Sequence, residues 1–342
     1  MSAVGVAPRI AVVGVSTLIG AAVIDELRAR KVAHAQLHAL DDARALGAAV
    51  AGEEGELPVG DVAGFDFSQV DLAFFCGRRV LSERYAEAAA EHAWVIDGSA
   101  QFRMRAEVPL VAADVNPGAL AGIGSRGLIA LPGSASVALG TVLAPLDALG
   151  GLERVEAATY QAVSGSGRGA VDELAAETVA LLRGQKPSGR AFGQQIAFNV
   201  IPQVDEIEDD GVSREERRIW QETGRILGLS RLPINVTAVR VPVFFGHCLA
   251  VHASFRRPVA PSEAAEVLQR GIGISLIDGP LSLKLPTPAA LATAPDRVYV
   301  GRIRADPTRD LALNFWVLAD NVRKCAAHNA VSVAQILVNR PQ

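Results

Sequence analysis

Residues 9–30 decide the fold, and they read RIAVVGVSTLIGAAVIDELRAR. The run from Arg9 to Val13 is short and apolar, as in a buried strand, and it ends at Gly14. From Leu18 to Arg30 the apolar residues recur at helical spacing. The sequence therefore predicts a strand, a glycine turn and a helix, which is how a nucleotide-binding domain begins.

The same stretch has an alternative interpretation as a secretion signal, because residues 10–24 are mostly apolar. A membrane span needs about 20 apolar residues. This run is shorter, its basic flank is Arg9 alone, and it continues directly into Asp25 and Glu26 of the expected helix. We therefore expect a folded domain here, a cytoplasmic protein and no membrane partner.

Composition narrows the class of protein. The chain has 342 residues, 50% hydrophobic and 20% charged, which is enough for two domains with separate cores. Its net charge of −4 gives no general attraction to nucleic acid, so a small-molecule partner is expected. The cysteines Cys76, Cys248 and Cys325 lack paired spacing, which argues against disulfides and a zinc site and fits a reducing cytoplasm.

The pattern of apolar residues differs between the two halves of the chain. The first half alternates helical stretches with short apolar runs, which predicts a parallel sheet with strands at Arg9–Val13, Gln36–Leu40, Asp71–Phe75, Trp94–Ile96 and Leu128–Leu131. After a helix at Val137–Leu149 the strands are longer, which predicts a mixed sheet in a second domain. The further strands and helices are expected at Val155–Val163, Val236–Val243, Leu249–Phe255, Val298–Ile303 and Leu311–Leu318, and at Val171–Leu182, Glu215–Leu227, Ser262–Arg270 and Asp320–Val338.

The predicted glycine turn is a candidate cofactor site. A pyrophosphate group would rest on the free N–H groups at the helix start, which makes cofactor contacts of Gly14, Ser16, Thr17, Leu18 and Ile19. A solvated turn without a ligand is the alternative, because Thr17 carries a Cβ where close backbone approach favours glycine.

The second predicted strand bears on the choice of cofactor. Asp41 and Asp42 stand at its end, where a carboxylate accepts from a ribose 2′-hydroxyl group and repels a 2′-phosphate. NAD or NADP is therefore possible, and NAD is favoured.

Five later segments carry a resemblance. They are VIDGSAQFR at 95–103, VPLVAADVN at 108–116, YQAVSGSG at 160–167, VRVPVFFGH at 239–247 and DNVRKCAAHNAV at 320–331. In order and spacing they resemble the aspartate-semialdehyde dehydrogenase family, and the chain is similar to its Usg-type branch. The resemblance implies an α/β fold. A Rossmann-type nucleotide-binding domain would comprise residues 1–132 and 320–342, and an α+β catalytic and dimerisation domain residues 133–319, in a homodimer.

The same resemblance implies a mechanism and a departure from it. The family reduces an aspartyl phosphate: a cysteine thiolate displaces the phosphate to form an acyl-enzyme, which then accepts hydride from NADPH. Here the corresponding segment is LPGSAS at 131–136, so Ser134 takes the place of the nucleophile and Gly133 that of a neighbouring asparagine. A serine hydroxyl is a weaker nucleophile than a thiolate near neutral pH.

Other site residues follow from the resemblance alone. It implies that Gln161 orients the substrate, that His247 is the acid/base, and that Asn321 contacts the nicotinamide. It also implies four substrate-binding residues, Arg103, Glu215, Arg218 and Arg240. A buried structural histidine and surface arginines are the alternatives. Cys248 and Cys325 are expected to be apolar fillers, with Cys248 on the opposite sheet face from His247.

Four functions fit these features. The leading hypothesis is a divergent family member whose dehydrogenase reaction is lost or reduced. The others are a working semialdehyde dehydrogenase of amino-acid biosynthesis, a hydrolase with Ser134 as nucleophile and His247 as base, and a non-enzymatic dimeric binding protein.

Overall fold

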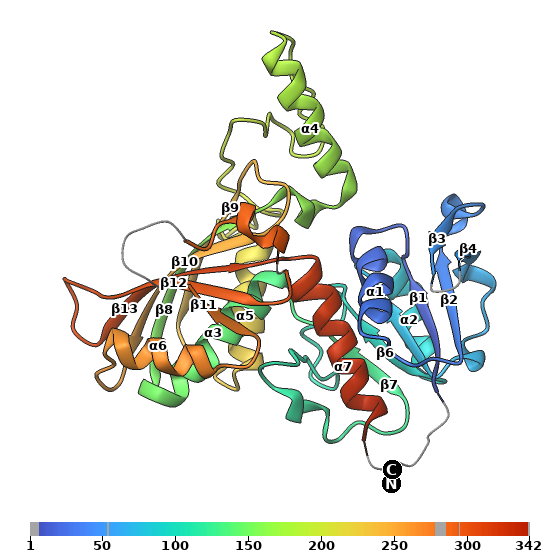
Figure 1. Cartoon of the computed structure of the whole chain (residues 1–342), viewed down its shortest axis with the longest axis horizontal. Helices are drawn as coiled ribbons and strands as arrows, with labels where there is room; N and C mark the ends of the chain where they lie inside the picture. Colours follow the sequence, from blue (N-terminus) through green and yellow to red (C-terminus); the bar gives the residue numbers. More distant parts are fainter. Residues whose placement is uncertain (1–6, 53–54, 278–284, 294, 341–342) are drawn as a thin grey trace. The chain divides into compact units, whose positions relative to one another are not determined.

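The computed structural model describes residues 7–52, 55–277, 285–293 and 295–340. It divides into two compact units, Met1–Pro132 with Ala326–Gln342 and Gly133–Cys325 (Figure 1). The expected division ran after residues 132 and 319. The second boundary of the structure lies further along because Asn321 is hydrogen-bonded to Ser164 and Gly246 of the second unit.

The first unit is built on a seven-stranded sheet in the order β3-β4-β2-β1-β5-β6-β7. All neighbouring strands are parallel except β3 and β4. The strands are β1 Arg9–Val13, β2 Gln36–Asp41, β3 Ala49–Ala51, β4 Glu56–Asp61, β5 Leu72–Phe75, β6 Trp94–Asp97 and β7 Gly127–Ala130. The prediction omitted β3 and β4, because β3 is very short and β4 contains Pro58 and Gly60, which are unusual in strands.

Helices α1 Leu18–Ala29, α2 Arg79–Ala90 and α7 Asn329–Val338 complete this unit. Helix α1 begins at Thr17, whose hydroxyl accepts from the N–H of Gly20. One face of α1, which includes Val23 and Leu27, packs into the core with Phe74 of β5 and Val331 of α7. The end of the chain is therefore part of the first core.

The predicted closing helix Asp320–Val338 is interrupted in the structure. Arg323–His328 forms a π-helical turn, in which the N–H of Cys325 donates to the carbonyl of Asp320, five residues earlier. The Asp320 carboxylate accepts from the N–H groups of Val322 and Arg323 and so caps this turn. Apolar periodicity does not reveal such a wide turn, so the sequence suggested one continuous helix.

The second unit holds a six-stranded sheet in the order β11-β12-β13-β10-β8-β9. The pairs β8–β9 and β11–β12 are parallel and the others antiparallel, so the predicted mixed sheet is confirmed. The strands are β8 Leu152–Gln161, β9 Ile234–Arg240, β10 His247–Phe255, β11 Ile274–Leu276, β12 Val298–Ala305 and β13 Ala312–Ala319. The helices are α3 Ser134–Gly150, α4 Arg168–Leu182, α5 Arg214–Ile226 and α6 Pro261–Arg270.

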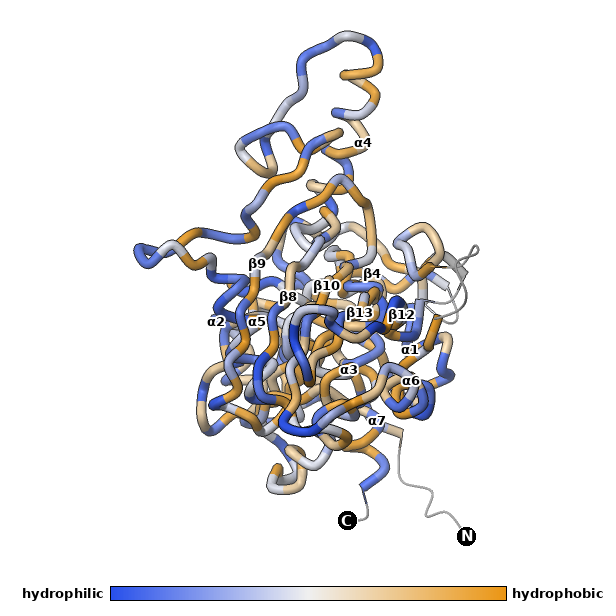
Figure 2. Tube along the Cα trace, turned by 90° about the vertical axis from the view of Figure 1, so that its left-hand side faces the viewer, coloured by the Kyte–Doolittle hydropathy of each residue, from blue (hydrophilic) through white to orange (hydrophobic). Residues whose placement is uncertain are grey.

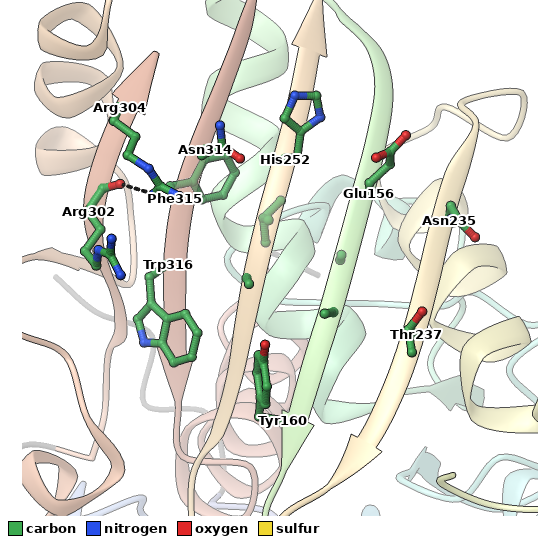
Figure 3. Close-up of a pocket in the computed structure, with 14 residues that line it drawn as sticks. Glu156, Tyr160, Asn235, Thr237, His252, Arg302, Arg304, Asn314, Phe315 and Trp316 are labelled. Carbon is green, nitrogen blue, oxygen red and sulfur yellow. Dashed lines mark hydrogen bonds between the residues drawn. The ribbon is translucent and has the colours of Figure 1, made fainter. Parts of the chain in front are cut away.

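Helices α3, α5 and α6 pack on one face of this sheet. On the other face Tyr160, Trp316, His252 and Glu156 border a hollow of about 480 Å³, and Figure 3 shows their side chains rising from three neighbouring strands. None of the helices in the described parts of the chain is long and apolar enough to span a bilayer.

Candidate active site

Topology brings Gln161, Arg240 and His247 to one edge of the second sheet. Gln161 ends β8 and is the register partner of Arg240, which ends the parallel strand β9. His247 begins β10, which runs antiparallel to β8, so its side chain reaches the same edge. All three residues are nearly fully buried, with exposed fractions of 2%, 4% and 2%.

The protonation state of His247 is set by its neighbours. Its Nδ1 accepts from the backbone N–H of Ala162 at 3.2 Å. Because an amide N–H can only donate, the proton of the neutral ring is on Nε2. Burial and the charge of Arg240 lower the pKa of His247 to about 3, so the ring is neutral at physiological pH. His247 therefore presents an N–H donor at Nε2.

Arg240 lies beside this ring and is held by the same loop. Its Nη1 donates to the carbonyl of Ala162 at 2.7 Å. Burial lowers the pKa of Arg240 to about 10, against the opposing charges of Glu215 and Asp205, so the guanidinium is still charged at neutral pH. A buried cation of this kind binds carboxylates well, because its planar fork matches their two oxygens.

Gly165 lies close to both of these side chains. A Cβ atom at this position would lie 3.0 Å from Nη1 of Arg240 and 3.4 Å from Nε2 of His247. The two donors therefore both lie next to the Gly165 backbone, where a side chain would crowd them. Gly165 itself is exposed.

Helix α5 adds two charged side chains to the cluster. Its start is fixed by a capping box between Ser213 and Glu216. In the first turns, Glu215 accepts from Nε2 of Gln161 at 3.1 Å. One turn later, Arg218 pairs with Asp205 at 2.6 Å. The structure thus links Gln161 to Glu215 directly and His247 to Arg240 through Ala162, and it places Arg218 on the same helix as Glu215.

Ser134 is the first residue of α3 and is half-buried. Its hydroxyl makes no hydrogen bond to any residue that the structure describes. The turn before it is fixed by Glu222 of α5, whose Oε2 accepts from the N–H of Gly133 at 2.6 Å and from the hydroxyl of Ser136 at 2.9 Å. Glu222 is 1% exposed, so its carboxylate is enclosed beside this helix start.

Asn321 is hydrogen-bonded within the second unit. Its Oδ1 accepts from the N–H of Gly246 at 3.0 Å, and its Nδ2 donates to the hydroxyl of Ser164 at 3.0 Å. Because Gly246 precedes His247, the amide of Asn321 fixes the strand start that carries this histidine. It is 5% exposed.

The glycine turn of the first unit needs glycine at two positions. Gly14 has a φ of 85°, and a Cβ on Gly20 would lie 2.2 Å from the carbonyl oxygen of Gly14. Thr17 turns its hydroxyl inward, where it bonds to the carbonyls of Gly14 and Cys76. The side chain of Thr17 thus caps the helix and does not face outward. Leu18 and Ile19 follow as the first helical residues.

Asp41 is bonded to this turn. It is fully buried, and its Oδ2 accepts from both the N–H and the hydroxyl of Ser16, at 2.9 and 2.6 Å. Its Oδ1 accepts from Arg78 at 2.7 Å and from the N–H of Asp42. Asp42 is the more exposed carboxylate of the pair, and it binds Arg44 and Arg78.

Arg103 belongs to the first unit and donates to the carbonyl of Gly98 at 2.9 Å. Burial raises the pKa of the nearby Asp97 carboxyl, and the charge of Arg103 opposes that shift.

Cys248 lies on the open sheet face with Leu318 and Leu291, as expected of an apolar filler, and burial raises the pKa of its thiol to about 12.

Sequence reasoning missed Asp205, Gly165, Arg78 and Glu222. For Glu222 a signal existed, because it stands seven residues after Glu215 and so shares its helix face. The partners of the other three depend on chain segments that are distant in sequence, so no local pattern marked them.

Comparisons with known proteins agree with this geometry. Residues 9–123 match the family described as "Semialdehyde dehydrogenase, NAD binding domain", and residues 143–324 match "Semialdehyde dehydrogenase, dimerisation domain". The chain is 38% identical over 331 residues to an aspartate-semialdehyde dehydrogenase of Shewanella violacea, covering 96% of this chain and 97% of that protein. It is 37% identical to one of Legionella pneumophila, covering 96% and 95%. The crystal structure of aspartate semialdehyde dehydrogenase II from Vibrio cholerae is similar with a TM-score of 0.95 at 37% identity, over 98% of this chain and 100% of that one.

Proposed function

Because the chain belongs to the aspartate-semialdehyde dehydrogenase family, we propose that it keeps the family's substrate pocket but has lost, or greatly reduced, the dehydrogenase reaction. The observation that carries the proposal is a serine at position 134, where the family's nucleophile stands. The proton of the His247 ring is on Nε2, so this nitrogen offers a hydroxyl no base.

The pocket residues support binding of a small aldehyde that carries a carboxylate and an amine. The buried guanidinium of Arg240 would bind the carboxylate, and Glu215 the amine, while the Nε2–H of His247 would donate to the aldehyde oxygen. Arg218 supplies further positive charge for an anion such as phosphate. A bound nicotinamide would accept hydride from the reacting carbon.

Reaction at position 134 would need a base. A serine hydroxyl is almost wholly protonated at neutral pH, so its attack must be assisted while the bond forms. With Nδ1 occupied by the Ala162 N–H, Nε2 of His247 has no lone pair to accept that proton. A hydrolase triad requires the opposite arrangement, with Nδ1–H donating to a carboxylate, so this geometry also argues against the hydrolase hypothesis.

We propose NAD as the cofactor in preference to NADP. The nucleotide-binding unit supplies the glycine turn, with Gly14, Ser16, Leu18 and Ile19 lining it. Asp41 and Asp42 place negative charge at the end of β2, and Arg44 and Arg78 are already held by these carboxylates. Titration calorimetry should show tighter binding of NAD than of NADP, and the reverse order would contradict this choice.

We also propose a cytoplasmic homodimer that pairs through the second unit. The open face of its sheet carries Tyr160 and Trp316, whose ring centroids lie 5.5 Å apart, and the match to a dimerisation domain spans these strands. Cys76, Cys248 and Cys325 are all free and buried, which suits a reducing compartment.

Substrate binding without turnover tests the proposal. Titration of the protein with aspartate semialdehyde should give saturable heat, and Arg240→Lys should weaken binding at least about tenfold, because a lysine cannot reproduce the bidentate contact. Arg9→Lys, at an exposed ion pair of the first unit, is the matched control and should bind like the unmodified protein. Equal binding by Arg240→Lys would exclude this pocket.

A further inference from the structure

The start of helix α3 is bonded to a buried carboxylate, that of Glu222. The N–H groups of a helix's first turn carry partial positive charge and normally stabilise an anion there. In this protein the carboxylate of Glu222 already lies at that end, bonded to the N–H of Gly133 and the hydroxyl of Ser136. Ser134 lies between these two contacts, followed by Ala135.

We propose that Glu222 is a positioning residue that occupies the anion-binding end of α3 from within and thereby sets the reactivity of the side chain at position 134. The inference rests on the proposed placement of Ser134 in the active site. It adds a residue that neither the sequence motifs nor the substrate-binding network contains.

Two consequences follow from the carboxylate's place. Through its bonds on both sides of Ser134, Glu222 fixes the backbone of the turn and so directs the side chain at position 134. Its negative charge, enclosed at 1% exposure, also opposes any second negative charge on that side chain. The carboxylate thus holds the turn in shape and disfavours an ionised nucleophile.

A cysteine at position 134 makes this effect measurable without substrate or cofactor. The Ser134→Cys variant would be alkylated with iodoacetamide across a pH series, since the rate follows the thiolate fraction and yields the thiol pKa. Adding Glu222→Gln keeps an acceptor for Gly133 and Ser136 but removes the charge. We expect this second change to lower the thiol pKa by about one unit or more.

The matched control is Glu216→Gln in the same Ser134→Cys background. Glu216 is on the same helix, but its carboxylate accepts from Ser213 and Ala238. Six residues of helix separate it from Glu222, about 9 Å along the axis. Its thiol pKa should equal that of Ser134→Cys alone. A Glu222→Gln profile that coincides with the control would overturn the proposal.

A further variant keeps the test possible if the Glu222→Gln protein does not fold. Ser136→Ala removes one donor to the carboxylate and leaves its charge less compensated, so the thiol pKa of Ser134→Cys should rise. An unchanged or lower value would contradict the proposal. Because alkylation involves no turnover, this test is independent of whether the unmodified protein acts on aspartate semialdehyde.

Discussion

His247 shows how one backbone contact can decide the chemistry of a side chain. Spacing and resemblance pointed to it as an acid/base together with Arg240 and Gln161, and strand register does place the three at one edge. Its tautomer, however, depends on the N–H of Ala162, a contact that no sequence pattern encodes. The meeting of these three positions was therefore predictable from the sequence, whereas their protonation and hydrogen bonds were not.

Burial of His247 predicts a pH-dependent stability. Its folded pKa of about 3 lies below the unfolded value, so between these pH values only the unfolded chain binds the proton, and stability falls as pH falls. From pH 6.5 to 5 this amounts to about 2 kcal/mol in the free energy of unfolding. His247→Asn, followed by urea denaturation, should lack this loss. His92→Asn, at an exposed site, should keep it, and equal pH profiles of His247→Asn and the unmodified protein would refute the prediction.

Gly165 offers a steric test of the same cluster. Gly165→Ala would place a methyl group 3.0 Å from Nη1 of Arg240 and so obstruct the ligand space. Overpacking of this kind costs about 1–3 kcal/mol, so aspartate semialdehyde should bind roughly tenfold or more weakly in calorimetry. Gly169→Ala is the control, because a Cβ there meets nothing within 4 Å. Unchanged affinity of Gly165→Ala would show that the ligand does not lie between Arg240 and His247.

At the scale of elements, helix α4 and the segment after it form an arm that stands out from the sheet of its unit (Figures 1 and 2). The arm has a small core of its own, made by Ala170, Leu174, Ile196, Ala197 and Ile201 with Val163. Inside it, Glu177 accepts from the N–H groups of Gly189, Ile196 and Ala197 at 2.8, 2.9 and 3.1 Å. Burial would raise the pKa of Glu177, but these donors outweigh it and lower the pKa.

Removing that carboxylate should loosen the arm. Glu177→Ala leaves buried N–H groups without an acceptor, at a cost of about 2 kcal/mol. We expect faster tryptic cleavage at Arg183, Lys186 or Arg190, which lie in the exposed segment. Asp172→Ala, at an exposed position of the same helix, should be cleaved at the original rate. Identical digestion of both variants would show that Glu177 does not hold the segment.

Periodicity predicted most of these elements but not their irregular parts. The helix expected at Val171–Leu182 begins three residues earlier, at Arg168, and the one at Glu215–Leu227 is displaced by one residue. The π-helical turn was not predicted because it depends on hydrogen bonds to Asp320. Strand β4 was not predicted because it depends on pairing with β2. Elements with a long amphipathic face can be predicted from the sequence, while those stabilised by partners elsewhere in the chain cannot.

At the scale of the whole molecule, the prediction is dimerisation through the second sheet. Ala250 lies at the centre of the open face, on β10 between β8 and β13. Ala250→Arg would place an unpaired charge in a face-to-face contact while leaving the monomer's core unchanged. Sedimentation at micromolar concentration should give a dimer for the unmodified protein and a monomer for this variant. Ala121→Arg, exposed in the first unit, should remain dimeric, and a monomeric unmodified protein would contradict the assignment.

The central claim is that a family pocket with serine at position 134 does not sustain the dehydrogenase reaction. Phosphate-dependent oxidation of aspartate semialdehyde, followed as reduction of NAD or NADP, tests it most directly. We expect activity at or below detection for the unmodified protein and measurable activity for Ser134→Cys, since a thiolate needs no base at the moment of attack. Robust turnover by the unmodified protein that disappears in Ser134→Ala would contradict the account and make serine a competent nucleophile.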